Sequence, residues 1–230
     1  MRTFGLLLLA GVVGLALALG TGRLAVPDRW NPWAPLAVAD EPNLLTGYKL
    51  GRLADDPPAC RAVLASSGMR YAAEPDRRVD GDCGWRDAVR ISATPTAVSQ
   101  PLVLACPAAV ALALWDRHSV QPLARRLFGA AVTRIDHLGS FVCRTIGGEA
   151  GGRRSEHAQA NALDVAGFVL ANGRTIRVVR DWHGDDAPGR FLREVHGGAC
   201  RFWNVVLGPD YNAAHRDHLH LDRGALRACR

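Results

Sequence analysis

The order of apolar and polar residues divides the chain into an apolar N-terminal run, a proline-rich stretch and a long mixed region. The apolar run extends from Phe4 to Gly20 and follows a Met-Arg start. A positive charge ahead of a leucine- and alanine-rich run is typical of an export signal, and this length is at the lower limit for a membrane-spanning helix. Residues 1–22 are therefore predicted to be either a cleaved signal peptide or a retained N-terminal membrane anchor. Both alternatives place the rest of the chain in the periplasm or at the periplasmic face of the inner membrane.

Residues 23–44 show no hydrophobic period and carry prolines at positions 27, 32, 35 and 42. Proline interrupts helices because it lacks the backbone N–H and clashes with the preceding turn. This stretch is predicted to be an extended arm that precedes a domain at 45–230. Its tryptophans, Trp30 and Trp33, could pack on the domain or lie at a membrane surface, and packing is the preferred interpretation.

Four segments of the domain have apolar residues at helical spacing. Such spacing places apolar side chains three and four residues apart on one face of a helix. The last of the four is preceded by Asp185 and Asp186, whose carboxylates can cap a helix N-terminus. The predicted helices are 60–69, 101–115, 119–129 and 188–197.

Short runs of β-branched and aromatic residues predict strands in much of the remaining domain. Two hairpins are expected, one around Gly139 and one across Asn172-Gly173, a strong turn signal. Helices early in the domain and hairpins late favour an α+β fold, with a small antiparallel sheet and helices packed on it. The expected strands are 83–92 as one strand or two, 131–138 with 140–145, 163–170 with 175–182, 205–207, and 218–222.

The composition is that of a folded domain. Hydrophobic residues make up 48% and charged residues 22% of the chain, which is too apolar for a disordered protein. The formal net charge is +6, but the arginines are scattered and Lys49 is the only lysine. Nucleic-acid binding requires a clustered basic surface, so no nucleic-acid partner is expected. The charge is compatible with a mild attraction to anionic envelope polymers or lipid.

Six cysteines form an even set, as expected for the disulfides of an exported chain. No C-x2-C pair is present, which argues against a cysteine metal site. Among the fifteen possible connectivities, the pairing of sequence neighbours crosses no loops and is preferred. The expected bonds are Cys60–Cys83, Cys106–Cys143 and Cys200–Cys229.

Histidines and aspartates in the second half of the chain have the composition of a metal site. His215, His218 and His220 fall within six residues, and His157 stands seven residues before Asp164. Imidazole and carboxylate groups suit Zn²⁺, and three protein ligands leave a fourth position for water, as in catalytic zinc sites. Surface histidines beside a turn would need no metal, but two coincident spacings favour a zinc hydrolase.

Two motifs carry a resemblance to known families. Residues 155–164 read Ser-Glu-His-Ala-Gln-Ala-Asn-Ala-Leu-Asp and resemble the S-x-H-x2-G-x-A-x-D signature of the zinc D-Ala-D-Ala peptidases. The H-x2-H-x-H element at 215–220 resembles their C-terminal histidine element. Position 160 is alanine instead of the signature glycine, which implies ordinary backbone angles there. A closer resemblance is to the bacterial extensin-like family, and it is carried in order by residues 30–36, 141–144, 199–200 and 229–230.

The resemblance implies a zinc D-Ala-D-Ala peptidase-like fold with His157, Asp164 and His220 as zinc ligands. In the carboxypeptidases an acidic residue three positions before the last ligand activates the water, and Asp217 occupies that position. Asp217 is the preferred general base, provided that the strand begins after it, since neighbours on a strand point to opposite faces. His218 is the competing base because it shares the face of His220.

Three further residues are assigned supporting roles. His215 is expected to form hydrogen bonds at the metal site. Arg144, beside Cys143, is a candidate to hold a substrate carbonyl or carboxylate with its planar guanidinium. A surface arginine beside a disulfide is nearly as good an interpretation of Arg144. Ser155 is expected to orient the loop before His157.

The favoured function is an exported zinc peptidase that hydrolyses an amide bond in peptidoglycan peptides with metal-activated water. Its partner would be peptidoglycan or another envelope peptide, and its cofactor Zn²⁺. The alternative is a non-catalytic envelope-binding module in which zinc is structural. An open fourth coordination position favours the enzyme, whereas a fourth protein ligand favours the binding module.

Overall fold

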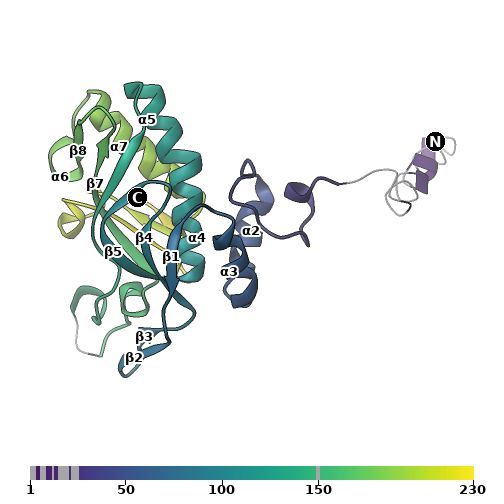
Figure 1. Ribbon diagram of the computed structural model, residues 1–230, viewed down its shortest axis with the longest axis horizontal. Coiled ribbons are helices and arrows are strands. Elements are labelled where there is room, and N and C mark those ends of the chain that lie inside the picture. Colours follow the sequence, from purple (N-terminus) through teal and green to yellow (C-terminus); the bar gives the residue numbers. More distant parts are fainter. Residues whose placement is uncertain (1–3, 6–8, 12, 15–20, 22–25, 149–150) are drawn as a thin grey trace.

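The computed structural model describes most of the chain from residue 26 onward (Figure 1). The described residues are 4–5, 9–11, 13–14, 21, 26–148 and 151–230. Most of the expected signal or anchor at 1–22 lies outside them. Within the described residues, no helix is long and apolar enough to cross a membrane.

A mixed β-sheet forms the centre of the molecule (Figure 1). In the described chain its nine strands are β1 (Arg70–Ala73), β4 (Ala88–Ala93), β5 (Ala97–Ala105), β6 (Val132–Gly139), β7 (Ala162–Leu170), β8 (Thr175–Arg177), β9 (Val205–Leu207), β10 (Leu219–Asp222) and β11 (Ala228–Cys229). Their order is β1-β4-β5-β6-β7-β10-β9-β11, with β8 also paired to β7. Most neighbours are antiparallel, but β5–β6 and β9–β11 are parallel. The α+β class is confirmed, whereas the expected small antiparallel sheet is larger and mixed.

Helices cover one face of the sheet. They are α2 (Leu44–Arg52), α3 (Pro57–Ala65), α4 (Cys106–Trp115), α5 (Gln121–Phe128), α6 (Val178–Asp181) and α7 (Ala187–Ala199). Helices α4, α5 and α7 lie against the sheet, and α2 and α3 lie beyond α4 (Figure 1). The predicted helix at 188–197 is confirmed as α7, and the carboxylate of Asp186 caps it by accepting from the N–H of Gly189.

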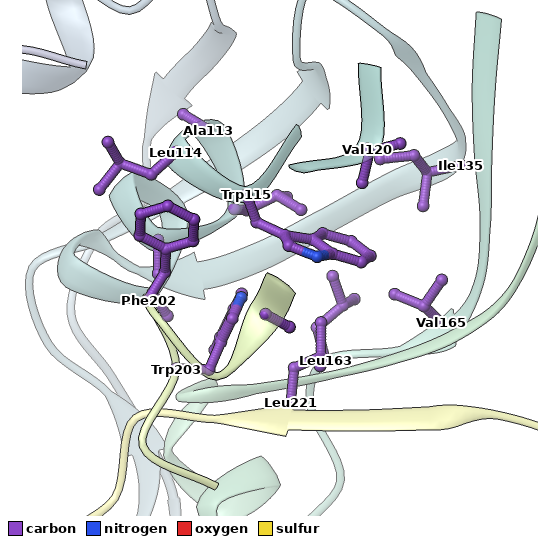
Figure 2. Close-up of a cluster of buried hydrophobic side chains, with 14 of the residues drawn as sticks. Ala113, Leu114, Trp115, Val120, Ile135, Leu163, Val165, Phe202, Trp203 and Leu221 are labelled. Carbon is purple, nitrogen blue, oxygen red and sulfur yellow. The ribbon is translucent and has the colours of Figure 1, made fainter. Parts of the chain in front are cut away.

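Helix α4 is buried on all sides because its sequence has no polar face. Every residue from Ala108 to Trp115 is buried. The indole of Trp115 packs among side chains from β7 and β10, including Leu163 and Leu221 (Figure 2). The helix begins at Cys106, so the prediction of a helix from Pro101 is wrong: residues 101–105 complete β5, which pairs with β4.

The two predicted hairpins have different outcomes. The hairpin across Asn172-Gly173 forms from β7 and β8, with Gly173 at a φ of +83° that favours glycine. The expected strand at 175–182 is wrong in its second half, because β8 ends at Arg177 and residues 178–181 form α6. The hairpin around Gly139 is wrong, because β6 pairs with β7 and the chain leaves the sheet at Ser140. Phe141 then packs edge-on against Trp85, with 4.9 Å between ring centroids, which draws the segment away from β6.

Residues 142–146 find their partner in residues 153–157 instead. The N–H of Val142 donates to the carbonyl of His157 (3.2 Å), and the N–H of Ser155 donates to the carbonyl of Arg144 (3.1 Å). An isolated bridge between Thr145 and residue 154 continues this pairing. The segment that carries Arg144 therefore lies beside the segment that carries His157.

All six cysteines form disulfides, but two of the three expected pairings are wrong. Cys200–Cys229 is confirmed, and the other bonds are Cys60–Cys106 and Cys83–Cys143. Cys60 on α3 meets the first residue of α4 because these helices pack together. Cys83 lies in a short ribbon of β2 (Arg77–Asp80) and β3 (Cys83–Trp85), beside the segment displaced by Phe141. The spacing of the cysteines along the sequence could not predict either of these two pairs.

The arm at 23–44 is partly integrated into the domain. Leu36 and Val38 are buried in the main core, and His118 Nε2 donates to the carbonyl of Val38 (2.7 Å). Trp33 is 81% exposed and Trp30 48% exposed, so the expectation that the two tryptophans pack on the domain is wrong for Trp33 and only half met for Trp30.

Candidate metal centre

Two neighbouring strands place an aspartate and a histidine on the sheet face opposite the core. Leu163 and Val165 of β7 are buried in the core, so Asp164 between them points to the other face. The same alternation in β10 directs His220 away from its two buried leucine neighbours. His220 pairs directly with Asp164 in the antiparallel register, which brings the two side chains together.

A single turn of 3-10 helix, η4 (Glu156–Gln159), presents His157 to this pair. The hydroxyl of Ser155 caps the turn by accepting from the N–H of His157 (3.4 Å). Ala160 ends the turn with φ of +52°, so the expectation of ordinary backbone angles at this alanine is wrong. The left-handed conformation explains why glycine suits the position. Ala160 tolerates it with its methyl group buried against Trp85 and its neighbours.

The three side chains meet at one point. His157 Nε2 lies 3.1 Å from Asp164 Oδ1 and 3.1 Å from His220 Nδ1, and the latter two atoms are 3.0 Å apart. A tetrahedral zinc ion with bonds of about 2.0–2.1 Å would separate its ligands by about 3.3 Å. Two imidazoles and one carboxylate are also a donor set that suits Zn²⁺. These residues therefore fit a zinc ion.

The outer nitrogens of both rings have hydrogen-bond acceptors. His157 Nδ1 donates to the carbonyl of Ser140 (3.3 Å), and His220 Nε2 donates to the carboxylate of Asp222 (3.0 Å). Each proton on an outer nitrogen leaves the lone pair of the inner nitrogen free for a metal. The two inner nitrogens are 3.1 Å apart, and a metal that displaced the proton held between the rings and Asp164 would meet both lone pairs.

Charge at the centre reinforces this arrangement. Burial opposes ionisation of the Asp164 carboxyl, but hydrogen bonds with His157 and His220 outweigh it and hold the pKa of Asp164 well below its ordinary value. Burial opposes protonation of His220, yet hydrogen bonds to Asp164 and Asp222 raise the pKa of its imidazole to about 9. The two carboxylates thus favour positive charge between the rings, which a divalent cation would supply in place of a proton.

Asp217 and His218 lie beside the centre, with His218 nearer to it than Asp217. Strand β10 begins at Leu219, so the condition set for Asp217 is met and its side chain is not forced to the opposite face. His218 Nε2 lies 3.5 Å from Asp164 Oδ1, and His218 Nδ1 donates to Asp217 Oδ1 at 2.9 Å. His218 therefore contacts the ligand set, and Asp217 contacts His218.

His215 faces the same space from the short turn η5 (Ala213–His215). Its ring centroid is 5.3 Å from that of His218 and 5.7 Å from that of His220. Its Nδ1 donates to the side-chain oxygen of Asn212 (2.8 Å), which leaves Nε2 with a lone pair. Burial lowers the pKa of His215 to about 4, and repulsion by His220 and His218 adds to the effect. His215 is therefore a neutral imidazole near the three ligands.

Arg144 is exposed at the edge of the centre. Its backbone is held by the neighbouring Cys83–Cys143 bond and by the contact with Ser155. Its guanidinium is near enough to His215 to contribute to the lowered pKa of that imidazole. The residues proposed from the sequence thus gather in one region, with Arg144 exposed at its edge and the Asp217 side chain 41% exposed.

Sequence reasoning missed Asp222 and the Ser140 carbonyl. Asp222 follows His220 by two positions, so alternation in a strand places both on one face. An H-x-D pair at the end of a predicted strand was therefore an available signal. Nothing in the sequence marked the Ser140 carbonyl, because its position depends on how the chain leaves β6.

A second group within the described residues, His196 with Cys200 and Cys229, also has metal-ligand spacing. Both sulfurs are joined in a disulfide, which removes the thiolates that a metal would need. His196 donates instead to the carbonyl of Arg230 (3.1 Å). With Cys200 and Cys229 in a disulfide, this group is a covalent crosslink and does not offer thiolate ligands to a metal.

Comparison with protein families gives one match. The family model described as Extensin-like protein C-terminus matches residues 58–230. Comparisons with curated proteins and with solved structures gave no match. The matched region contains all three residues of the His157–Asp164–His220 cluster.

Proposed function

This chain belongs to the extensin-like family, and from this membership and its histidine–aspartate cluster we propose that it is an exported zinc peptidase. Its substrate would be an amide bond in peptidoglycan peptides, and its fold would be related to that of the zinc D-Ala-D-Ala peptidases. The observation that carries the proposal is the meeting of His157, Asp164 and His220 within 3.0–3.1 Å. The signature at 155–164 supplies the reaction class by resemblance.

The residues of the centre divide into holding and orienting groups. His157, Asp164 and His220 would hold the zinc ion, while Ser140 and Asp222 would fix the orientation of the two rings. When bound, zinc would polarise a substrate carbonyl and lower the pKa of a coordinated water. The buried positions of His157 and Asp222 would keep the ligand geometry rigid.

We assign proton transfer to His218 and orientation of its ring to Asp217. His218 Nε2 is directed at the ligand set, while Asp217 accepts from Nδ1 on the far side of the ring. This order resembles the orientation of a catalytic imidazole by a carboxylate. It favours His218, the competing base identified from the sequence, over Asp217 itself.

His215 and Arg144 are proposed to contact the substrate. A neutral His215 can donate or accept a hydrogen bond without adding charge beside the cation. The exposed guanidinium of Arg144 can bind a carbonyl or carboxylate in a bidentate manner. Peptidoglycan stem peptides present both groups, so these two residues would orient the scissile amide.

The test is incubation of the purified protein with muropeptides and added zinc, followed by mass spectrometry of the products. His218→Gln and Asp217→Asn are expected to retain zinc and to lose about 10²–10⁴-fold in hydrolysis, the usual contribution of positioned acid–base groups. A fully active His218→Gln variant with an inactive Asp217→Asn variant would return the base role to Asp217. No new product from zinc-loaded wild-type protein would rule out this peptidase function.

A structural zinc in a non-catalytic envelope-binding module is the second candidate. It is favoured by the 3.5 Å distance between His218 Nε2 and Asp164 Oδ1, because a small movement would make His218 a fourth ligand. Zinc-edge X-ray absorption distinguishes the two functions. Two histidines and a water favour the peptidase, whereas three histidines, falling to two in His218→Gln, favour the binding module.

A further inference from the structure

Helix α2 buries Leu50 in the core but also buries its lysine, and it leaves a leucine and a tyrosine exposed. Its outward stripe contains Leu44, Tyr48 and Arg52 at intervals of four residues, and Leu44 is 93% exposed. Its only lysine, Lys49, is 5% exposed and points inward. The Nζ of Lys49 donates to the carbonyl of Asp28 at 2.7 Å. A helix that buries its lysine and exposes a leucine and a tyrosine indicates an apolar or interfacial surrounding on its outer side.

The arm adds two tryptophans to this surface. Lys49 and Arg52 bind backbone carbonyls of residues 28, 32 and 35, which holds the arm along α2. Trp30 and Leu44 line one hollow of about 710 Å³, and Trp33 and Arg52 line another of about 420 Å³. We call the surface formed by Trp30, Trp33, Leu44 and Tyr48 the arm face.

We propose that the arm face lies at the surface of a phospholipid bilayer. Tryptophan and tyrosine favour the membrane–water interface because their rings are apolar while their N–H and O–H groups remain hydrated. The apolar run that ends at Gly20 is separated from Asp28 by only seven residues. An extended chain of that length spans about 25 Å. If the run is inserted in a bilayer, the arm face is therefore held close to that bilayer.

Position and charge are consistent with this partner. The arm, α2 and α3 form the end of the molecule nearest the N-terminus, whereas α6 and β8 form the opposite end (Figure 1). Charges of both signs line the two hollows of the arm face: Arg29 and Glu41 beside Trp30, and Arg52 beside Trp33. Insertion would therefore depend on the aromatic and apolar side chains more than on attraction to anionic lipid. The inference does not rest on the proposed peptidase function.

Tryptophan fluorescence tests this proposal sharply, because Trp30 and Trp33 are exposed while the other four tryptophans are at most 6% exposed. The full-length protein is mixed with vesicles of phosphatidylethanolamine and phosphatidylglycerol that contain a headgroup spin-labelled lipid. The labelled lipid is expected to quench the wild-type fluorescence. The double variant Trp30→Phe with Trp33→Phe is expected to lose most of this quenching. Leu44→Ser keeps both tryptophans and is expected to weaken it.

Adding Val179→Trp to the double variant gives the matched control. Val179 is 65% exposed on α6, at the opposite end of the molecule. This tryptophan is expected to be quenched by aqueous acrylamide and not by the labelled lipid. The proposal is overturned if Trp30 and Trp33 remain open to acrylamide and insensitive to labelled lipid on vesicles. It is also overturned if their protection arises without vesicles and grows with protein concentration, which would identify a second copy as the partner.

Discussion

At the scale of single residues, the metal centre depends on which nitrogen each histidine turns inward. His157 would bind a metal through Nε2 because its Nδ1 donates to the Ser140 carbonyl, whereas His220 would bind through Nδ1 because its Nε2 donates to Asp222. The two rings are therefore different tautomers: His157 carries its proton on Nδ1 and His220 carries its proton on Nε2. The neighbours that fix the tautomers are as necessary to the geometry as the ligands themselves.

Asp222 offers the clearest test of this residue-scale account. Asp222→Asn keeps the shape of the side chain but removes the charge that supports the proton on His220 Nε2. The affinity for zinc is expected to fall about 10–100-fold, as is usual for loss of such a supporting group. Competition with a chromophoric chelator measures the change. Asp210→Asn is the control, because Asp210 is exposed and pairs with His183, which is not part of the cluster. Equal affinities in the two variants would contradict the account.

At the scale of elements, the centre requires that the 140–146 segment be fixed beside η4. This segment supplies the Ser140 carbonyl and Arg144, and the Cys83–Cys143 bond ties it to the β2–β3 ribbon. The edge-on contact of Phe141 with Trp85 supports the same position. A crosslink outside the sheet thus helps to fix the orientation of His157 on η4.

Removal of this disulfide is expected to weaken both folding and zinc binding. The double variant Cys83→Ser with Cys143→Ser should lose about 4 kcal/mol of unfolding free energy in the chain-entropy model, since the bond closes a 60-residue separation. Its zinc affinity should also fall, because Ser140 is no longer held. Removing Cys60–Cys106, with a separation of 46 residues, should cost a similar free energy without a selective loss of zinc. Denaturant titration and chelator competition measure the two quantities, and equal zinc loss in both variants would contradict the role assigned to the segment.

Helices and strands that are marked by their own residues could be predicted from the sequence. Elements whose position depends on contacts between residues far apart in the sequence could not. Helix α7 has a capping aspartate and a proline in its first turn, and β10 alternates cleanly, so both were found. The three ligands followed from spacing and resemblance. The partner of residues 140–145 depended on the contact between Phe141 and Trp85, which are 56 positions apart by their numbers. Two of the three predicted disulfide pairings were wrong for the same reason, since α3 and α4 meet only after the five strands β1 to β5 have intervened.

At the scale of the whole molecule, the arm is attached to the core through a titratable contact. His118 Nε2 donates to the carbonyl of Val38, whose side chain is buried with Leu36 in the main core. Burial lowers the pKa of His118 below its ordinary value of 6.5. A histidine that is held neutral in the folded state takes up protons more readily when the chain unfolds.

Stability is therefore expected to fall as the pH drops below about 6.5 toward the lower pKa of folded His118. Above about pH 6.5, His118 is neutral in both the folded and the unfolded state, so the free energy of unfolding no longer changes with its protonation. His118→Gln should show a smaller decrease between pH 7 and 5 than the wild type, in denaturant titrations at matched zinc. Parallel curves for the two proteins would show that His118 does not contribute to the acid sensitivity.

Zinc stoichiometry tests the central claim most directly. We expect one zinc ion per chain by native mass spectrometry in the wild type and in His196→Ala, whose imidazole belongs to the disulfide-linked group. His157→Ala and His220→Ala should each lose the ion, because each removes one of three converging ligands. A wild-type protein that binds no zinc, or His157→Ala and His220→Ala variants that retain it, would contradict the assignment of the cluster as a metal centre.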